Sequence, residues 1–312
     1  MSVTVSAPPP AAPPDEKQTS PAVPREPAPP ARAGFALAGT VLCVLAAVLF
    51  GFAANLTVAG HLQHARDQQV AHDTLREQLA LGTAPVGQQT FDGKAVGLGA
   101  PLALLRIPVL GVEEVVAEGT TSTVLMSGPG HRRDTPLPGQ AGTSILMGRQ
   151  WAYGSPFGHL HDLPPGAAIE VMTGQGKAVY RVTGIRRAGE KLPPALAAGE
   201  GRLTLMTATG APYTPSGVLR VDAELVTPVQ PNPPRPLRTG WISGAEKPLA
   251  GEEGAWLQVF LWTQGLLLAA LLTVWAHRVW GRWQTWICAV PLLAALGLAD
   301  AGAVTALLPN LL

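Results

Sequence analysis

The sequence predicts an all-β fold, a closed β-barrel of about eight strands, which three transmembrane α-helices attach to a membrane. The prediction rests on three long apolar runs, on a series of short alternating segments between them, and on a composition of 47% hydrophobic and 14% charged residues. So few charges in so apolar a chain indicate that part of it lies in lipid. The formal net charge of +1, without a basic cluster between the apolar runs, argues against nucleic acid as a partner.

The N-terminal part predicts a flexible tail followed by a membrane helix. Residues 1–32 contain ten prolines and few apolar side chains, so they cannot bury enough surface to become ordered. Residues 33–60 contain no charged side chain and exceed the roughly 20 residues that a helix needs to cross the hydrocarbon core. A cleaved signal peptide is the competing interpretation, but the apolar run is too long and no Ala-x-Ala site follows it. We therefore expect an uncleaved helix with the tail in the cytoplasm.

Residues 61–84 predict a helical stalk that continues from the membrane, because leucines and alanines recur at spacings of three and four. The stalk carries His61, His64 and His72. No carboxylate or cysteine completes a metal-ligand set with them, so we expect solvated histidines, no metal site and no cofactor.

Residues 85–226 predict the barrel. Short segments with β-like composition alternate with turns such as Thr173-Gly-Gln-Gly176, and so many strands in so short a region imply a barrel or a sandwich. The last strand alternates apolar residues with Arg220, Asp222 and Glu224, which leaves one face for the core and one for a site. The expected strands are Leu102–Ile107, Val112–Ala117, Ser144–Met147, Ala168–Met172, Ala178–Ile185, Arg202–Thr207 and Gly217–Val226.

A Pro-rich tether, residues 227–254, leads to two further membrane helices, 255–276 and 284–308. The loop 277–283 between them carries two arginines and no acid, and the positive-inside rule therefore places it in the cytoplasm. The segment 61–254 is then extracytoplasmic. Both cysteines, Cys43 and Cys288, lie in predicted membrane helices, so the extracytoplasmic region has no thiol.

Several motifs between residues 104 and 226 resemble those of the sortases, the bacterial cysteine transpeptidases, and follow the same order. Taken singly each is weak, but the combination identifies the family. The motifs are Arg106-Ile-Pro-Val-Leu-Gly111, Val116-Ala-Glu-Gly119, Ser127-Gly-Pro-Gly-His131 with Leu137-Pro-Gly139 and Gly142, the run from Phe157 to Val171, and Arg202-Leu-Thr-Leu-Met-Thr-Ala208 followed by Arg220.

The resemblance implies one groove with a cysteine that attacks a sorting-signal peptide, a histidine that protonates the leaving amine, and an arginine that orients the substrate. In this sequence Ala208 stands at the cysteine position, Arg149 at the histidine position and Arg220 at the arginine position. Two guanidinium groups in one groove favour an anionic ligand or a buried acid such as Asp222, so Arg149, Ala208, Arg220 and Asp222 are the candidate groove residues.

The sequence therefore predicts a multi-pass sortase-like protein of the cell membrane that lacks transpeptidase activity and binds or scaffolds a cell-envelope peptide or protein. The partner could be an active sortase or its substrate, and lipid surrounds the helices. The abundance of Ala, Gly and Pro is compatible with a Gram-positive host of high GC content. Two alternatives stay open: a sortase-type transpeptidase or hydrolase with a nucleophile other than cysteine, and an interaction protein in which the membrane hairpin acts and the barrel is a passive spacer.

Cysteine labelling on intact cells tests the predicted topology. In a Cys43→Ser/Cys288→Ser background, Lys94→Cys and Thr239→Cys should react with an impermeant thiol reagent, whereas Trp280→Cys should react only after permeabilisation. Labelling of position 280 but not of position 94 on intact cells would show that the orientation is inverted.

Overall fold

The computed structural model describes residues 42, 46, 48–90 and 92–312. The predicted tail 1–32 lies outside the described residues, as does much of the first half of the predicted membrane helix 33–60. The account below concerns the compact unit that residues 47–312 form.

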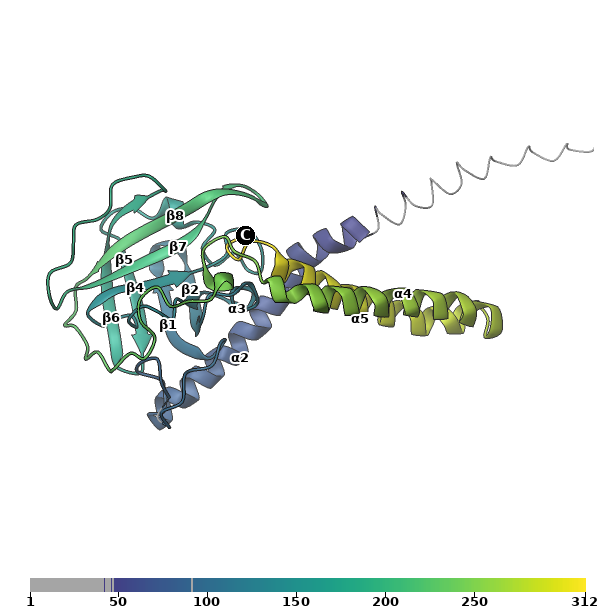
Figure 1. Cartoon of the computed structure of the whole chain (residues 1–312), viewed down its shortest axis with the longest axis horizontal. Coiled ribbons are helices and arrows are strands. Elements are labelled where there is room, and N and C mark those ends of the chain that lie inside the picture. The colour runs from purple at the N-terminus through teal and green to yellow at the C-terminus, as the bar shows by residue number, and fades with distance from the viewer. Residues whose placement is uncertain (1–41, 43–45, 47, 91) are drawn as a thin grey trace, which may run out of the picture. The chain divides into compact units, whose positions relative to one another are not determined.

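Eight strands form a closed barrel in the order β1-β2-β3-β4-β7-β8-β6-β5, with β5 hydrogen-bonded to β1 (Figure 1). Two pairs, β2 with β3 and β4 with β7, are parallel, and the other pairs are antiparallel. The strands are β1 (Pro101–Ile107), β2 (Val112–Glu118), β3 (Gly130–His131), β4 (Gly142–Met147), β5 (Ala168–Thr173), β6 (Gly176–Arg186), β7 (Gly201–Ala211) and β8 (Thr214–Leu225).

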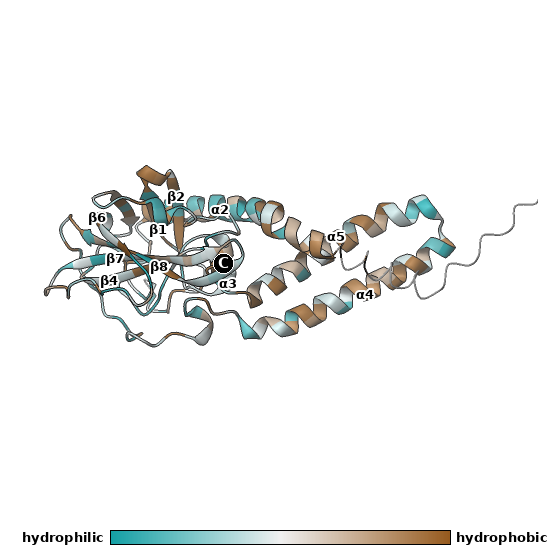
Figure 2. Ribbon diagram, turned by 90° about the horizontal axis from the view of Figure 1, so that it is seen from above, coloured by the Kyte–Doolittle hydropathy of each residue, from teal (hydrophilic) through white to brown (hydrophobic). Residues whose placement is uncertain are grey.

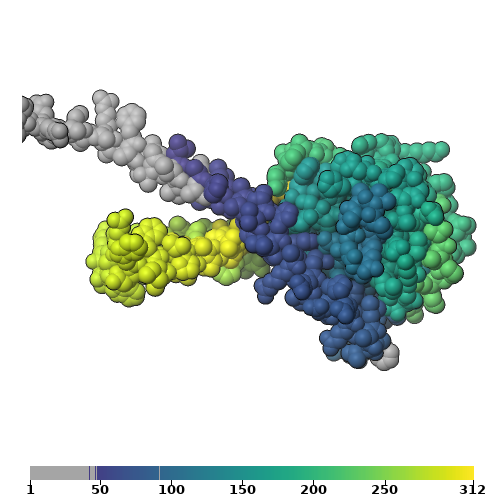
Figure 3. Space-filling model, turned by 180° about the vertical axis from the view of Figure 1, so that it is seen from behind, coloured from purple at the N-terminus to yellow at the C-terminus, as the bar shows by residue number. Residues whose placement is uncertain are grey.

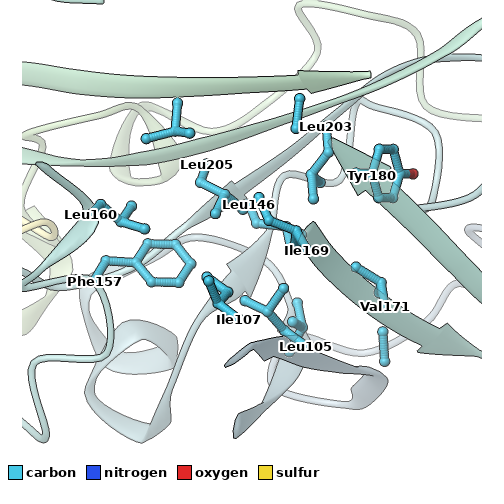
Figure 4. Packing of buried hydrophobic residues seen from close by; sticks show 14 of the residues in the cluster. Leu105, Ile107, Leu146, Phe157, Leu160, Ile169, Val171, Tyr180, Leu203 and Leu205 are labelled. Atoms are coloured by element: carbon cyan, nitrogen blue, oxygen red, sulfur yellow. The ribbon is translucent and has the colours of Figure 1, made fainter. Parts of the chain in front are cut away.

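Alternate residues of the strands fill the barrel. Leu203 and Leu205 of β7 point inward and meet Leu219 and Val221 of β8 in one buried cluster. Figure 4 shows the leucines of β7 directed toward Leu146 of β4 and the aromatic ring of Phe157. Apolar burial on this scale is the main favourable term that holds the strands together. The other face of β7 and β8 is left for the candidate site, as the alternation predicts.

The helix α2 (Gly60–Leu81), continuous with a π-helical turn at Asn55–Ala59, packs along the barrel surface (Figure 3). Its Gln68 side chain accepts from the backbone N–H of Val115 and donates to the carbonyls of Val115 and Ser127. His64 is buried and its Nε2 lies 3.0 Å from Oε1 of Glu114. The expectation of solvated stalk histidines is therefore wrong for His64, because β2 presents a carboxylate to the helix.

A short helix, α3 (Ser122–Ser127), connects β2 with β3 and begins at Thr121, whose hydroxyl accepts from the backbone N–H of Val124. The strand β3 that follows carries His131. Its Nδ1 lies 3.0 Å from Glu118 and its Nε2 lies 3.0 Å from the carbonyl of Pro136. His131 is completely buried and joins β2, β3 and the following turn, which agrees with a structural role. The remaining short helices are Pro108–Leu110, Leu160–Asp162, Gly244–Glu246 and Glu253–Ala255.

The helices α4 (Trp256–Val279) and α5 (Arg282–Leu307) form an antiparallel hairpin. Both are long and apolar enough to cross a membrane, and only 6% and 11% of their most apolar windows are buried, which is unlike core helices of a soluble domain. Figure 2 shows them hydrophobic along most of their length and hydrophilic at the connecting turn. Within the hairpin, the hydroxyl of Thr263 donates to Asp300 over 3.1 Å.

The predicted fold class is thus confirmed for the closed barrel and needs correction elsewhere. The described residues contain two candidate membrane helices rather than three, and 13 of the 28 residues of the predicted helix 33–60 lie outside them. The term all-β is also too narrow, since α2, α4 and α5 make up a substantial part of the described chain.

Tyr180→Phe tests one bond between the β3–β4 loop and β6. The backbone N–H of Gly139 donates to the phenolic oxygen of Tyr180, which is fully buried, and burial raises the pKa of this phenol to about 12. Removing the oxygen leaves the N–H without a partner, which should cost about 1–3 kcal/mol and lower the melting temperature by several degrees. Tyr213→Phe is the control, because Tyr213 is 40% exposed and should tolerate the change. Equal melting temperatures for both variants would contradict this assignment.

Candidate functional site

The candidate site lies on the outer face of β4, β7 and β8. Because Leu203 and Leu205 point into the barrel, Thr204, Met206 and Ala208 point outward. The parallel register aligns Met147 of β4 with Met206 of β7. The chain positions two residues further on, 149 and 208, therefore lie at the same end of this strand pair.

Contacts beyond the last paired residues hold this end together. The N–H of Gly148 donates to the carbonyl of Met206 over 3.0 Å, and the hydroxyl of Thr207 donates to the carbonyl of Gly148 over 2.9 Å. The outward alternation of β7 and the parallel register thus bring Ala208 and Arg149 onto neighbouring strand ends.

Ala208 is buried, with 1% of its surface exposed. It belongs to an apolar cluster on the outside of the barrel, distinct from the barrel core. The cluster comprises Leu125 of α3, Met147 of β4, Met206 and Ala208 of β7, Val218 of β8, and Leu311 from the segment that follows α5. The side chain at position 208 is therefore a methyl group within an apolar cluster.

Arg149 is completely buried. Its Nη2 donates to the hydroxyl of Ser122 over 2.7 Å and to the carbonyl of Ser122 over 3.0 Å, and its guanidinium lies over the ring of Tyr153. Burial lowers the pKa of this guanidinium to about 10, while Tyr153 and Glu252 oppose the shift. Arg149 remains protonated at neutral pH and connects the end of β4 to the beginning of α3.

Arg220 and Asp222 lie further along the same outer face, on β8. Arg220 is half-buried, and both its burial and the neighbouring Arg186 lower the pKa of its guanidinium, whereas Asp222 raises it. Asp222 is buried and forms an ion pair with Arg186 of β6. The hydroxyl of Thr204 donates to the same carboxylate over 2.6 Å.

A cavity of about 400 Å³ opens beside this ion pair. Its lining combines Arg186, Arg202, Thr204 and Asp222 with the loop 192–196, whose prolines and leucines are apolar. Nε of Arg202 is buried and has no hydrogen-bond partner within the described part of the chain. The cavity can therefore accept a ligand with an apolar portion and a hydrogen-bond acceptor.

The four predicted groove residues are thus only partly brought together. Ala208, Arg220 and Asp222 share the outer face of β7 and β8, and Arg149 lies at the matched end of β4 but donates to α3. Asp222 pairs with Arg186, which the sequence does not single out because the β6–β8 register is a long-range pairing. The segment after α5 is also missed, since it follows an apolar run without any pattern of its own. Among the described residues, no His, Cys, Asp or Glu cluster is placed to hold a metal ion.

Comparisons with known proteins agree on one family. Residues 105–226 match the family model described as the Sortase domain. The chain is similar to the sortase D5 transpeptidase of Clostridium perfringens, at 21% identity over 52% of this chain and 99% of that chain, with a TM-score of 0.43. Sortase E1 of Streptomyces coelicolor, solved with a tripeptide in the active site, is 27% identical over 41% of this chain and 90% of that chain, with a TM-score of 0.36. A sortase E mutant from Streptomyces avermitilis is 29% identical over 42% and 91%, with a TM-score of 0.36. A comparison with curated proteins found no match.

Arg149→Ala tests whether this guanidinium connects β4 to α3. The change empties a large buried volume and removes both hydrogen bonds to Ser122, so we expect a loss of roughly 2–5 kcal/mol in stability and a clearly lower melting temperature. Arg187→Ala is the matched control, because Arg187 is exposed. Thermal unfolding of the full chain in detergent gives the measurement. An unchanged melting temperature in the Arg149 variant would mean that the guanidinium does not stabilise the contact.

Proposed function

Since the chain belongs to the sortase family through residues 105–226, we propose that it is a membrane-anchored, extracytoplasmic member that performs no transpeptidation and instead binds or scaffolds a cell-envelope peptide or protein. The resemblance to sortases supplies the class of partner, because the family acts on sorting-signal peptides. An active sortase and its substrate are both candidates.

The observation that carries the proposal is the pair of residues at the matched ends of β4 and β7. Ala208 offers no nucleophile, and it lies within an apolar cluster. Arg149 offers no proton at neutral pH, since its pKa is about 10 and its Nη2 is bound to Ser122. Nucleophilic catalysis needs both a nucleophile and a group that moves its proton, so the loss of both supports a binding role.

A hydroxyl nucleophile is the alternative, and Thr207 is the nearest candidate. An activated hydroxyl must donate to a base, whereas the hydroxyl of Thr207 donates to the backbone carbonyl of Gly148. Thr207 also has only 1% of its surface exposed, which leaves little access for a substrate. These two facts favour binding over hydrolysis.

The membrane arrangement follows from α4 and α5. Their apolar, exposed surfaces suit lipid, and the turn between them carries Arg278 close to Arg282 without an acid. With this turn in the cytoplasm, both outer ends of the hairpin emerge on the extracytoplasmic side. The barrel then faces the cell envelope, where a peptide or protein partner is accessible.

Activity measurements on the purified full-length protein test the absence of chemistry. We expect neither hydrolysis nor transfer of sorting-signal peptides, and no covalent adduct with a thiol-directed sortase substrate mimic, because no thiol is present at position 208. An active sortase in the same detergent serves as the positive control. Turnover by the wild-type chain that a sortase inhibitor or heat denaturation abolishes would overturn the proposal.

Photocrosslinking in the native membrane distinguishes the barrel from the hairpin as the binding part. A photoreactive residue at Leu192, which is exposed on the cavity loop, should capture an envelope partner, whereas one at the exposed Leu271 of α4 should capture mainly lipid. Capture of a protein only from position 271 would instead support the hypothesis of a passive barrel.

A further inference from the structure

The end of the segment that follows α5, residues 310–312, is buried, although only 11% of the most apolar window of α5 is buried. Asn310 and Leu311 have no exposed surface, and Leu312 is 3% exposed. Figures 1 and 2 both show this end of the chain beside α3. The segment therefore leaves the hairpin and enters the candidate site.

Leu311 joins the segment to the strand ends that carry positions 149 and 208. Its carbonyl accepts from the backbone N–H of Gln150, the residue after Arg149, over 3.1 Å. Its side chain lies in the apolar cluster that contains Met147 of β4 and Ala208 of β7. One residue of the segment thus belongs to the packing at the ends of both strands.

Asn310 is held by its side-chain amide. The Nδ2 group donates to the carbonyl of Thr120 over 2.8 Å and to the carbonyl of Lys247 over 2.9 Å, and the backbone N–H donates to the carbonyl of Ala250 over 2.8 Å. The site therefore offers backbone carbonyls to an amide side chain and an apolar cup to the next residue. These are the means by which proteins recognise an extended peptide.

We infer that the outer face around Ala208 is a peptide-binding groove that this chain fills with its own segment 308–312, and that an envelope peptide with an amide side chain followed by an aliphatic residue binds there by displacing the segment. This inference rests on the proposed binding function. It adds the class of ligand, and it adds that the segment regulates access of the ligand to the groove. Because the segment continues directly from α5, displacement must act on the end of the hairpin, where the N–H of Glu252 donates to the carbonyl of Ala306.

Thiol accessibility at position 208 tests whether the segment covers the groove. In the full chain with Cys43→Ser and Cys288→Ser, Ala208→Cys should react slowly with a maleimide, and adding Leu311→Asp should raise the rate at least tenfold, because a carboxylate is costly to keep in an apolar cluster. Leu81→Asp is the matched control, since it places the same charge on a leucine of α2 that is 68% exposed and lies outside the apolar cluster, and it should leave the rate unchanged. If Leu311→Asp impairs folding, Asn310→Ala replaces it, as it removes the amide donors without adding charge.

Two outcomes of this experiment overturn the inference. In the first, Ala208→Cys with the native segment reacts as fast as an exposed cysteine. In the second, a folded Leu311→Asp or Asn310→Ala variant shows no acceleration.

Protection by a peptide in trans tests whether the groove accepts a ligand. The probe is a synthetic peptide with the sequence of residues 305–312, amidated and extended by lysines for solubility. It should slow labelling of Ala208→Cys/Leu311→Asp at least fivefold, and the same peptide with Asn310→Ala and Leu311→Asp should not. If Leu311→Asp accelerates labelling but the peptide does not protect Cys at position 208, the segment is a fixed part of the fold and the inference is overturned. The proposed binding function is tested separately by photocrosslinking.

Discussion

The parallel pairing of β4 with β7 is the constraint on which the candidate site depends. It aligns Met147 with Met206, and it therefore carries the chain to positions 149 and 208 at the same end of the barrel. Parallel strands cannot be joined by a tight turn, so the long connection between β4 and β7 must contain β5 and β6. The strand β8 pairs with β7 as a hairpin, and β6 and β5 continue the sheet from β8 to β1 and close the barrel.

The region around α3 joins this site to the membrane hairpin. Ser122 accepts from Arg149 and lies 3.3 Å from the carbonyl of Thr305 on α5, and Thr120 accepts from Asn310. The backbone N–H of Thr123 donates to Glu252 before α4. Arg149 therefore belongs to a network of polar contacts that reaches the beginning of α4 and the end of α5. A displacement of these helix ends would change the contacts at the ends of β4 and β7.

The sequence predicts strands that show an alternating pattern, but it does not predict contacts that depend on pairing between distant strands. Alternation placed Leu219, Val221 and Ala223 of the last strand in the core, and they are buried there. The two-residue strand β3 and the six-residue helix α3 are too short to leave a period. The Arg186–Asp222 pair depends on the β6–β8 register, and the burial of residues 310–312 depends on the fold as a whole. At the site, the motifs single out positions 149, 208 and 220. The contacts of these residues could not be predicted, because they join segments that are far apart in the sequence.

Burial explains why the two matched positions suit recognition better than chemistry. A catalytic thiol and imidazole must meet both a substrate and solvent-borne protons, whereas Ala208 and Arg149 are almost or completely inaccessible in this structure. Both side chains also stabilise their surroundings: the methyl group of Ala208 lies in an apolar cluster, and the guanidinium of Arg149 binds Ser122 and lies over Tyr153. Apolar contacts and backbone hydrogen bonds can hold a peptide without reacting with it. The contacts of residues 310 and 311 show what such binding uses here: the carbonyl of Thr120, the N–H of Gln150 and an apolar cluster.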